Sequence, residues 1–445
     1  MAGGNGATPE LGVSAVYRRL ARNSAWLAGG TVASALFMML AVVLSARALS
    51  AREFGLLVLL QAATMMVATL MSFSTQQPVI KLGSAALADG DMEHLGRIIG
   101  LGLLVDFLAA VVAMAGALLF LQFGRGLVDL ADSQVGVAAL FACSLLFTGY
   151  LTSNGIFRLL NRFDLLSLIQ AGCAAAVFAA TAYLYLSHAP FVAYCWAWAI
   201  FYALNSQIPL IVGLRLAGKA GIPVGLSRSR MREGETTTFF AYCWTTWGVA
   251  TVEALRSNGD SLVVGAVVSV EAAGIYNVAK QLAGVLRKAN TVYASAMFPE
   301  ISALSAHGAI ESATRVRMRM LWLSGLVGGL ATAAALLLGP LVLALLFGPR
   351  FAAAYGPLVI LTAAAACQLI SYTLSMYVQV FVGPERLFRA NLMAIVIFLI
   401  VVIPLTFGFS LYGTAVAQLL FSFALIYLCY SALQKRPQPA TRPCP

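Results

Sequence analysis

Twelve apolar stretches, each about the length of a membrane-spanning helix, run along this chain, and polar segments separate them. A helix needs about 20 largely apolar residues to cross the hydrocarbon core of a bilayer. The chain is 61% hydrophobic and only 10% charged, whereas soluble domains carry about 25% charged residues. The strand-like alternation of a membrane barrel is absent. The pattern therefore predicts an all-α polytopic membrane protein and excludes a water-soluble globule.

The twelve expected spans share this length and composition. Six spans precede the longest polar segment and six follow it. The spans are expected at 24–46, 54–75, 97–121, 135–157, 165–187, 191–214, 237–258, 272–298, 320–347, 355–382, 388–409 and 411–433.

Basic residues between the spans predict the orientation of the chain. If the N-terminus is cytoplasmic, most Lys and Arg residues of the loops face the cytoplasm, and the outer segments hold only Arg47, Arg52, Arg125 and Arg350. An excess of Lys and Arg marks cytoplasmic loops, so we expect both termini in the cytoplasm. The same rule explains the net charge of +11, and no nucleic acid partner is needed.

The two halves of the chain share a pattern. Gly55 and Pro78 bracket an apolar stretch in the first half, and Gly274 and Pro299 lie at similar spacing in the second. Six spans per half would make the two repeats run in the same direction; chance similarity is the alternative. We expect a cytoplasmic segment at 1–23, a six-helix lobe at 24–216, an inter-lobe linker at 217–235, a second six-helix lobe at 236–433 and a cytoplasmic tail at 434–445.

Charged side chains inside the expected spans are few and concentrated. An ionisable group in the hydrocarbon region is costly, so by default it indicates function and faces the interior of the bundle. Glu253, Arg256 and Asp260 recur at spacings of three and four, which places them on one helix face. The next span carries a polar stripe, consisting of Asn277, Lys280, Gln281, Arg287, Lys288 and Thr291.

Two further charges complete the intramembrane set. Asp106 lies near the middle of the third span, and Arg47 lies at the outer end of the first. Cations outnumber anions in the set, and an excess of positive charge in a cleft of low dielectric constant favours an anionic cargo. Arginine in particular binds phosphate with a planar fork of donors. We therefore expect Arg47, Arg256, Lys280 and Arg287 to attract a phosphorylated substrate.

The anions and the neutral polar residues receive complementary assignments. Asp106, Glu253 and Asp260 would pair with these cations or couple transport to an ion gradient, while Asn277 and Gln281 would line the cavity. Each assignment has a structural alternative. The charges at 253–260 could form a self-neutralising cluster with Lys280, Arg287 could extend to the headgroups, and Asp106 could make an interhelical hydrogen bond.

Three stretches resemble the Wzx-type polysaccharide flippases of the multidrug/oligosaccharidyl-lipid/polysaccharide (MOP) exporter superfamily. ARALSAREFGLLVLL (46–60) is similar to the junction between the first two helices of that family. NGDSLVVGAVVSVEAAGIYNVAKQL (258–282) resembles its helix 7–8 region, and FPEISAL (298–304) resembles the loop that follows. The resemblance implies two parallel-repeat six-helix lobes that work by alternating access, with a hydrated cleft between them.

The resemblance also implies a cargo. Members of this family carry undecaprenyl-pyrophosphate-linked oligosaccharide repeat units from the cytoplasmic to the periplasmic leaflet of the bacterial inner membrane, for exopolysaccharide, capsule or O-antigen synthesis. The implied partners are this lipid-linked oligosaccharide, the membrane lipids and possible contacts with a polysaccharide polymerase and co-polymerase. The alternative within the superfamily is a cation-coupled drug antiporter of the MATE type.

Enzymatic activity is not expected. The three histidines form no HExxH pair, and the seven cysteines lack metal-like spacing, so neither a metal nor a cofactor is expected. A membrane glycosyltransferase or ligase would display a large outer loop with catalytic residues, whereas the outer loops of this chain are short.

Overall fold

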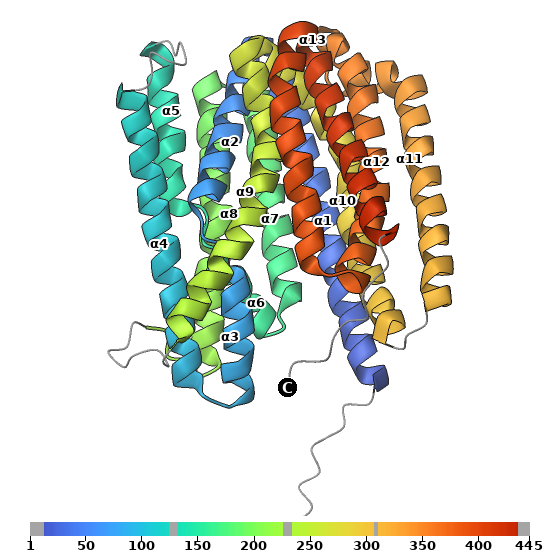
Figure 1. Ribbon diagram of the computed structural model, residues 1–445. Helices are drawn as coiled ribbons and strands as arrows, with labels where there is room; N and C mark the ends of the chain where they lie inside the picture. The colour runs from blue at the N-terminus through green and yellow to red at the C-terminus, as the bar shows by residue number, and fades with distance from the viewer. Residues whose placement is uncertain (1–12, 124–131, 226–233, 307–309, 435–445) are drawn as a thin grey trace, which may run out of the picture.

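The computed structural model describes residues 13–123, 132–225, 234–306 and 310–434, and these ranges are built of helices (Figure 1). The predicted all-α class is confirmed. The elements are α1 (Val13–Ala48), α2 (Ala51–Met71), α3 (Gln76–Ala88), α4 (Met92–Phe123), α5 (Asp132–Ser144), η2 (Leu145–Phe147), α6 (Leu151–Leu159), α7 (Phe163–Leu186), α8 (Phe191–Lys219), α9 (Glu235–Val267), α10 (Val270–Ala306), α11 (Ile310–Leu346), η3 (Pro349–Ala354), α12 (Tyr355–Phe381) and α13 (Pro384–Gln434).

These helices account for the twelve expected spans. Within the described ranges, nine segments are long and apolar enough to cross a membrane. The longest of them lies in α13, whose 51 residues break at Ser410 with a φ of 51°, so α13 makes two passes. α9 and α10 are also long enough, with 33 and 37 residues, but they are less apolar because they carry the intramembrane charges.

Two of the expected spans are interrupted inside the first half. α2 ends at Met71, and the chain turns through Ser74, whose φ is 48°, before α3 begins. The chain between the second and third expected spans, expected to be one of the polar segments that separate the spans, instead contains the helix α3. The fourth span divides into α5, η2 and α6, with Gly149 at a φ of 83° in the break. In the second half the chain stays helical through Pro299, so the loop expected there is also absent.

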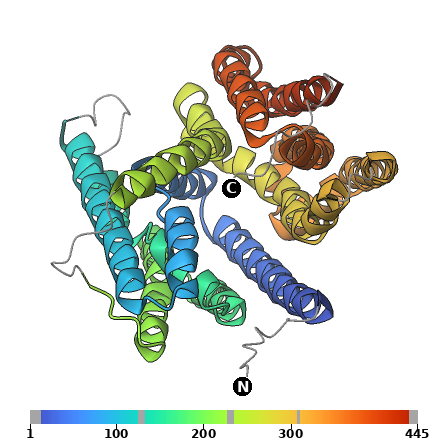
Figure 2. The ribbon, with the colours of Figure 1, turned by 60° about the horizontal axis from the view of Figure 1, so that its bottom comes forward.

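The two halves stand side by side, with α9 crossing from one to the other. In Figure 2 the helices α2–α8 lie on the left and α10–α13 on the right. Phe239 and Cys243, near the start of α9, are buried in the same apolar cluster as Val79 of α3 and Leu95 of α4. The C-terminal part of α9 packs against α10 and α13. α9 therefore belongs to both packing units along its length.

The halves meet where α2 and α10 begin. A Cβ atom on Gly55 would lie 2.0 Å from the Val270 carbonyl oxygen, and one on Gly274 would lie 3.0 Å from the Gly55 Cα. Only glycine permits this approach of two backbones. The same two glycines showed the repeated pattern in the sequence, so matching positions of the two halves are in contact.

Candidate functional site

The first part of the site is an arginine–glutamate pair on α9. Arg256 donates from Nε to Glu253 Oε2 at 3.0 Å, and its Nη2 donates to Glu253 Oε1. The Arg256 side chain is 8% exposed, whereas that of Glu253 is 60% exposed. Glu253 lies 18 residues into α9, about 27 Å along its axis. The pair therefore joins a buried guanidinium to a carboxylate at the surface of the structure.

The second part is an ion pair between α9 and α10. Lys280 Nζ donates to Asp260 Oδ1 at 2.6 Å, to Ser261 Oγ at 3.0 Å and to the carbonyl oxygen of Ser257. Asp260 is 1% exposed and Lys280 13%. The helical spacing thus lets Arg256 and Asp260 reach α10 and α13, whereas Glu253 stays exposed and contacts only Arg256 of its own helix.

Gln418 of α13 joins the two pairs. Its Oε1 accepts from Arg256 Nη1 at 3.1 Å, and its Nε2 donates to the Arg256 carbonyl at 2.9 Å and to Asp260 Oδ2 at 3.1 Å. Tyr276 of α10 donates its hydroxyl to the same carboxylate oxygen at 3.2 Å. The sequence argument did not single out Gln418, although a buried amide inside an apolar span is the signal that could have revealed it.

Arg287 is the cation that this network leaves over. Within the described ranges its Nη2 donates to the Lys280 carbonyl at 3.4 Å, and no carboxylate forms an ion pair with it. Asn277 and Gln281 on the same helix are half-buried. The side chain of Lys288 lies outside the described residues. Among the described side chains of this network, the paired charges thus cancel and the positive charge of Arg287 remains beside them.

The space around this network is small. A cavity of about 10 Å³ lies between α10, α12 and α13, lined by Lys280, Arg287, Gln368 and Gln418 together with apolar residues. That volume suits about one water molecule. This space inside the C-terminal half is therefore too small for a sugar phosphate; the hydrated cleft expected between the halves is a different place.

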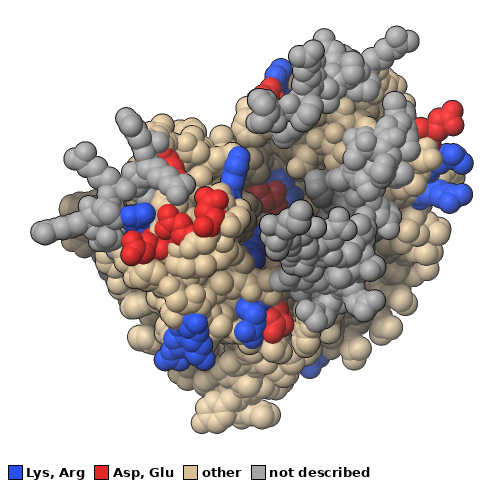
Figure 3. Space-filling view, turned by 90° about the horizontal axis from the view of Figure 1, so that it is seen from below, with Lys and Arg blue, Asp and Glu red and all other residues tan. Residues whose placement is uncertain are grey.

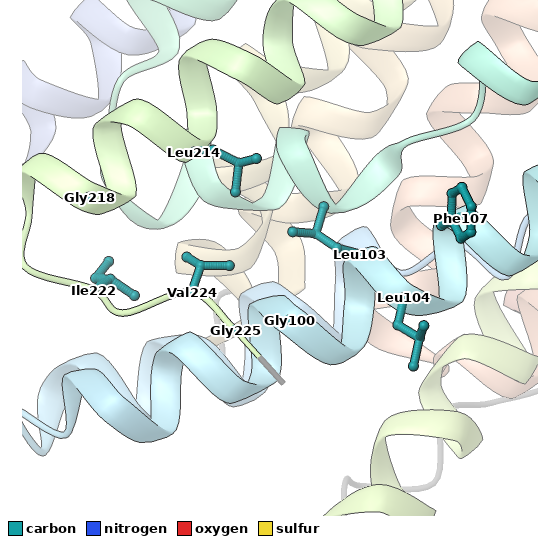
Figure 4. A pocket seen from close by; sticks show the side chains of 9 residues that line it. All are labelled: Gly100, Leu103, Leu104, Phe107, Leu214, Gly218, Ile222, Val224 and Gly225. Carbon is teal, nitrogen blue, oxygen red and sulfur yellow. The ribbon is translucent and has the colours of Figure 1, made fainter. Parts of the chain in front are cut away.

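A larger cavity elsewhere has no charged side chain among the described residues that line it. About 640 Å³ open between α4, α8 and the segment after α8 (Figure 4). Its lining is glycine and apolar side chains, among them Leu103, Phe107, Leu214 and Ile222. The described lining offers no charged or polar side chain that could bind a phosphate or an ion, so the charged network is the better candidate for the site.

The charged hollow lies between the two halves. Seen from below, the surface is recessed at the centre of the molecule, and basic and acidic atoms lie inside the recess (Figure 3). The cavity beside the α9–α10–α13 network holds about one water molecule, so the network is not an enclosed binding pocket for a larger ligand.

Asp106 belongs to a separate site in the first half. Its Oδ1 accepts from Thr75 Oγ1 at 2.7 Å, and its Oδ2 accepts from the Thr152 amide at 2.9 Å, while Thr152 Oγ1 donates to Thr75 Oγ1 at 3.0 Å. Thr75 precedes α3 and Thr152 lies in the first turn of α6. Asp106, which is 2% exposed, therefore joins the N-terminal end of α3 to that of α6. This is the interhelical hydrogen bond that the sequence left open as an alternative.

Arg47 does not join the α9–α10 network. Its Nε donates to the Leu346 carbonyl at 2.7 Å, and its Nη2 donates to the Leu345 carbonyl, both at the C-terminal end of α11. Arg350 reciprocates, since its Nη1 donates to the Leu49 carbonyl just after α1 at 3.1 Å. Carbonyls at a helix C-terminus lack helical donors and attract cations. Each arginine therefore caps the helix of the other half.

Comparison with known proteins gives the chain a family and a fold. The family described as "Polysaccharide biosynthesis protein" matches residues 20–305. The inner membrane protein YghQ of Escherichia coli is 23% identical over 353 residues, which cover 76% of this chain and 95% of YghQ.

Two solved structures share the fold. The lipid II flippase MurJ in an inward closed conformation matches with a TM-score of 0.71 at 12% identity, covering 92% of this chain and 87% of MurJ. An inward-facing multidrug resistance MATE transporter of the MOP superfamily matches with a TM-score of 0.67 at 13% identity, covering 92% and 93%. The family match, which covers more than half of the chain, and these two likenesses confirm the resemblance expected from the sequence: the chain belongs to the polysaccharide biosynthesis protein family and has the fold of the MOP superfamily.

Proposed function

We propose that this chain is a flippase of the bacterial inner membrane. It would carry polyprenyl-pyrophosphate-linked oligosaccharide units from the cytoplasmic to the periplasmic leaflet, for exopolysaccharide, capsule or O-antigen synthesis. The family match supports a glycan as cargo. The likeness to a lipid II flippase supports a lipid-linked cargo. The similarity to the inner membrane protein YghQ supports the location.

The observation that carries the proposal is the unpaired Arg287 beside two closed ion pairs. The charges of Glu253 and Arg256 cancel, and so do those of Asp260 and Lys280. These two pairs together with Arg287 therefore retain one positive charge within the described ranges. A pyrophosphate is the group that such an arginine would bind through its fork of donors. The polar sugars would follow in the recess, and the prenyl chain would remain in lipid.

Alternating access is supported by contacts at one end of the molecule. Arg47 and Arg350 join the ends of α1 and α11, and Phe54 meets Phe351 edge to face with ring centroids 5.7 Å apart. The Gly55–Gly274 contact lies beside them. We call these three contacts the end latch. If the N-terminus is cytoplasmic, the end latch closes the periplasmic end, and release of cargo on that side requires it to open.

Asp106 and Asp260 remain the proposed ion-coupling residues, in different ways. Asp260 is saturated by donors from α9, α10 and α13. Asp106 is held by a hydroxyl and an amide. Of the two, we propose Asp106 as the group that takes up a proton, because its hydrogen bonds come from neutral donors and none of the described ion pairs includes it.

The test is genetic complementation with chemical analysis of the accumulated lipid. Deletion of the gene should cause a lipid-linked glycan to accumulate in the inner leaflet, and the wild-type gene should clear it. Arg287→Glu should fail to clear it and Arg287→Lys should clear it partly. Arg389→Gln, which removes an exposed cation paired with Glu385, is the matched control and should behave as wild type. Full clearance by a normally expressed Arg287→Glu would contradict the proposal.

A MATE-type cation or drug antiporter is the second candidate, since the fold is shared with a multidrug transporter. The two differ in what the cell loses on deletion. A drug pump would leave the glycan lipids unchanged and would sensitise cells to organic cations. Accumulation of a glycan lipid, with unchanged sensitivity to organic cations, supports the flippase.

A further inference from the structure

The ammonium group of Lys280 lies in a cage of oxygen atoms presented by α9. The carbonyl oxygen of Ser257, Asp260 Oδ1 at 2.6 Å and Ser261 Oγ at 3.0 Å surround Nζ. A carbonyl, a carboxylate and a hydroxyl are the oxygen donors that hard cations take from proteins. The cage therefore has the chemistry of a cation site, and the lysine supplies the cation.

The cage is held in place by groups other than Lys280. The Ser261 amide donates to Asp260 Oδ1 at 2.6 Å, and Tyr276 and Gln418 donate to Asp260 Oδ2. Gln418 is itself fixed by two hydrogen bonds to Arg256. Three helices thus position the carboxylate, so the oxygen atoms would keep their places if the lysine side chain were shortened.

Burial makes an empty cage costly. Asp260 is 1% exposed. A buried carboxylate that loses its partner strongly destabilises the folded protein. A small cation that entered the cage would remove this penalty. The charge, the oxygen donors and the burial therefore all favour occupation by one positive charge.

We propose that Lys280 is a tethered cation that occupies a monovalent-cation site in the C-terminal half. In the native protein this site holds no alkali metal ion, because the ammonium group fills it. Shortening the lysine converts it into a site for sodium or potassium. The transport consequence, which rests on the proposed flippase function, is that wild-type export does not draw on an alkali cation at this position.

The experiment measures thermal unfolding of the purified full chain in detergent. Wild type, Lys280→Ala, Lys280→Met and the double variant Lys280→Ala/Asp260→Asn are each measured in sodium, potassium and choline chloride at equal ionic strength. Lys280→Ala should unfold at a lower temperature than wild type in choline, and one of the alkali cations should raise its Tm saturably, by about 2 °C or more. The other three proteins should not distinguish the three salts.

The controls separate the cage from other effects. Lys280→Met removes the charge but fills the space, and the double variant removes the carboxylate, so a cation bound elsewhere would still act on both. Lys280→Ser is the substitute if Lys280→Ala does not elute as a monodisperse protein. A folded small-side-chain variant whose Tm is the same in all three salts would overturn the proposal, as would a wild-type protein with the same saturable response. Glycan export is measured separately. The effect of sodium and potassium on the Tm can therefore be interpreted even if the chain proves not to be a flippase.

Discussion

Removing both arginines of the end latch should shift the protein toward a state that is open at that end. In the double variant Arg47→Ala/Arg350→Ala, the carbonyls of Leu49, Leu345 and Leu346 lose their donors from the opposite half. The buried Phe54–Phe351 contact and the glycine contact remain. The perturbation therefore weakens the closed state without removing its apolar core.

The size of the shift follows from the exposure of the bonds. Arg47 and Arg350 are both exposed, and a cation at an exposed helix C-terminus contributes about 0.3–1 kcal/mol. Losing two such interactions costs the closed state about 0.6–2 kcal/mol, since the carbonyls regain water when the arginines are absent. The ratio of open to closed molecules should then rise by about 3- to 30-fold.

Spin labels on opposite halves would measure this ratio. Ser187 after α7 and Ser410 in α13 are both exposed, and cysteines at these positions in a cysteine-free background would report the separation by pulsed electron resonance. The double variant should add population at longer distances. Arg52→Ala, which removes another exposed cation near the start of α2, is the control and should match wild type. An unchanged distance distribution in the double variant would refute the reasoning.

Three further substitutions test the packing and the buried charges. Gly55→Ala places a Cβ 2.0 Å from a carbonyl of the other half and should favour the same long label distances, whereas Gly259→Ala, with no atom within 4 Å of its Cβ, should not. Asp106→Asn keeps the shape of the side chain but cannot accept both hydrogen bonds. The free energy of unfolding, measured by denaturation, should therefore fall by about 1–3 kcal/mol. A Tm equal to that of wild type would contradict the structural role of Asp106. Asp260→Asn leaves Lys280 buried without its partner and should cost about 3–5 kcal/mol. Adding Lys280→Met should recover most of this loss, and additive effects of the two changes would argue against the ion pair.

Hydropathy made the spans predictable because the bilayer imposes a minimum length and apolarity on any crossing helix. Ser74 and Gly149 mark breaks that hydropathy does not report, since both lie within or beside apolar segments. Each break depends on a partner from another helix: Asp106 receives the hydrogen bonds of Thr75 and Thr152. The separate helix α3 follows from the first of these breaks.

The charged residues show the same division. Spacings of three and four placed Glu253, Arg256 and Asp260 on one face, because a helix fixes that geometry locally. The choice of partner was not local: Asp260 pairs with Lys280 of α10 and with Gln418 of α13, which is 158 residues away in the sequence. The charge and expected place of Arg47 suggested a cargo-binding cation. Its position at the end of α1, however, directs it to the carbonyls at the end of α11.

By itself, the sequence determined that the chain crosses a membrane repeatedly, that its charges gather in α9 and α10 and that its two halves share a pattern. Each of these follows from local composition, because apolarity, helical period and repeated glycines are written along the chain. Only the tertiary structure decided which charges cancel, which one remains and where the halves touch. Those outcomes depend on the meeting of α2, α9, α10 and α13, since ion pairs and helix contacts form between segments that the chain brings together only when it folds.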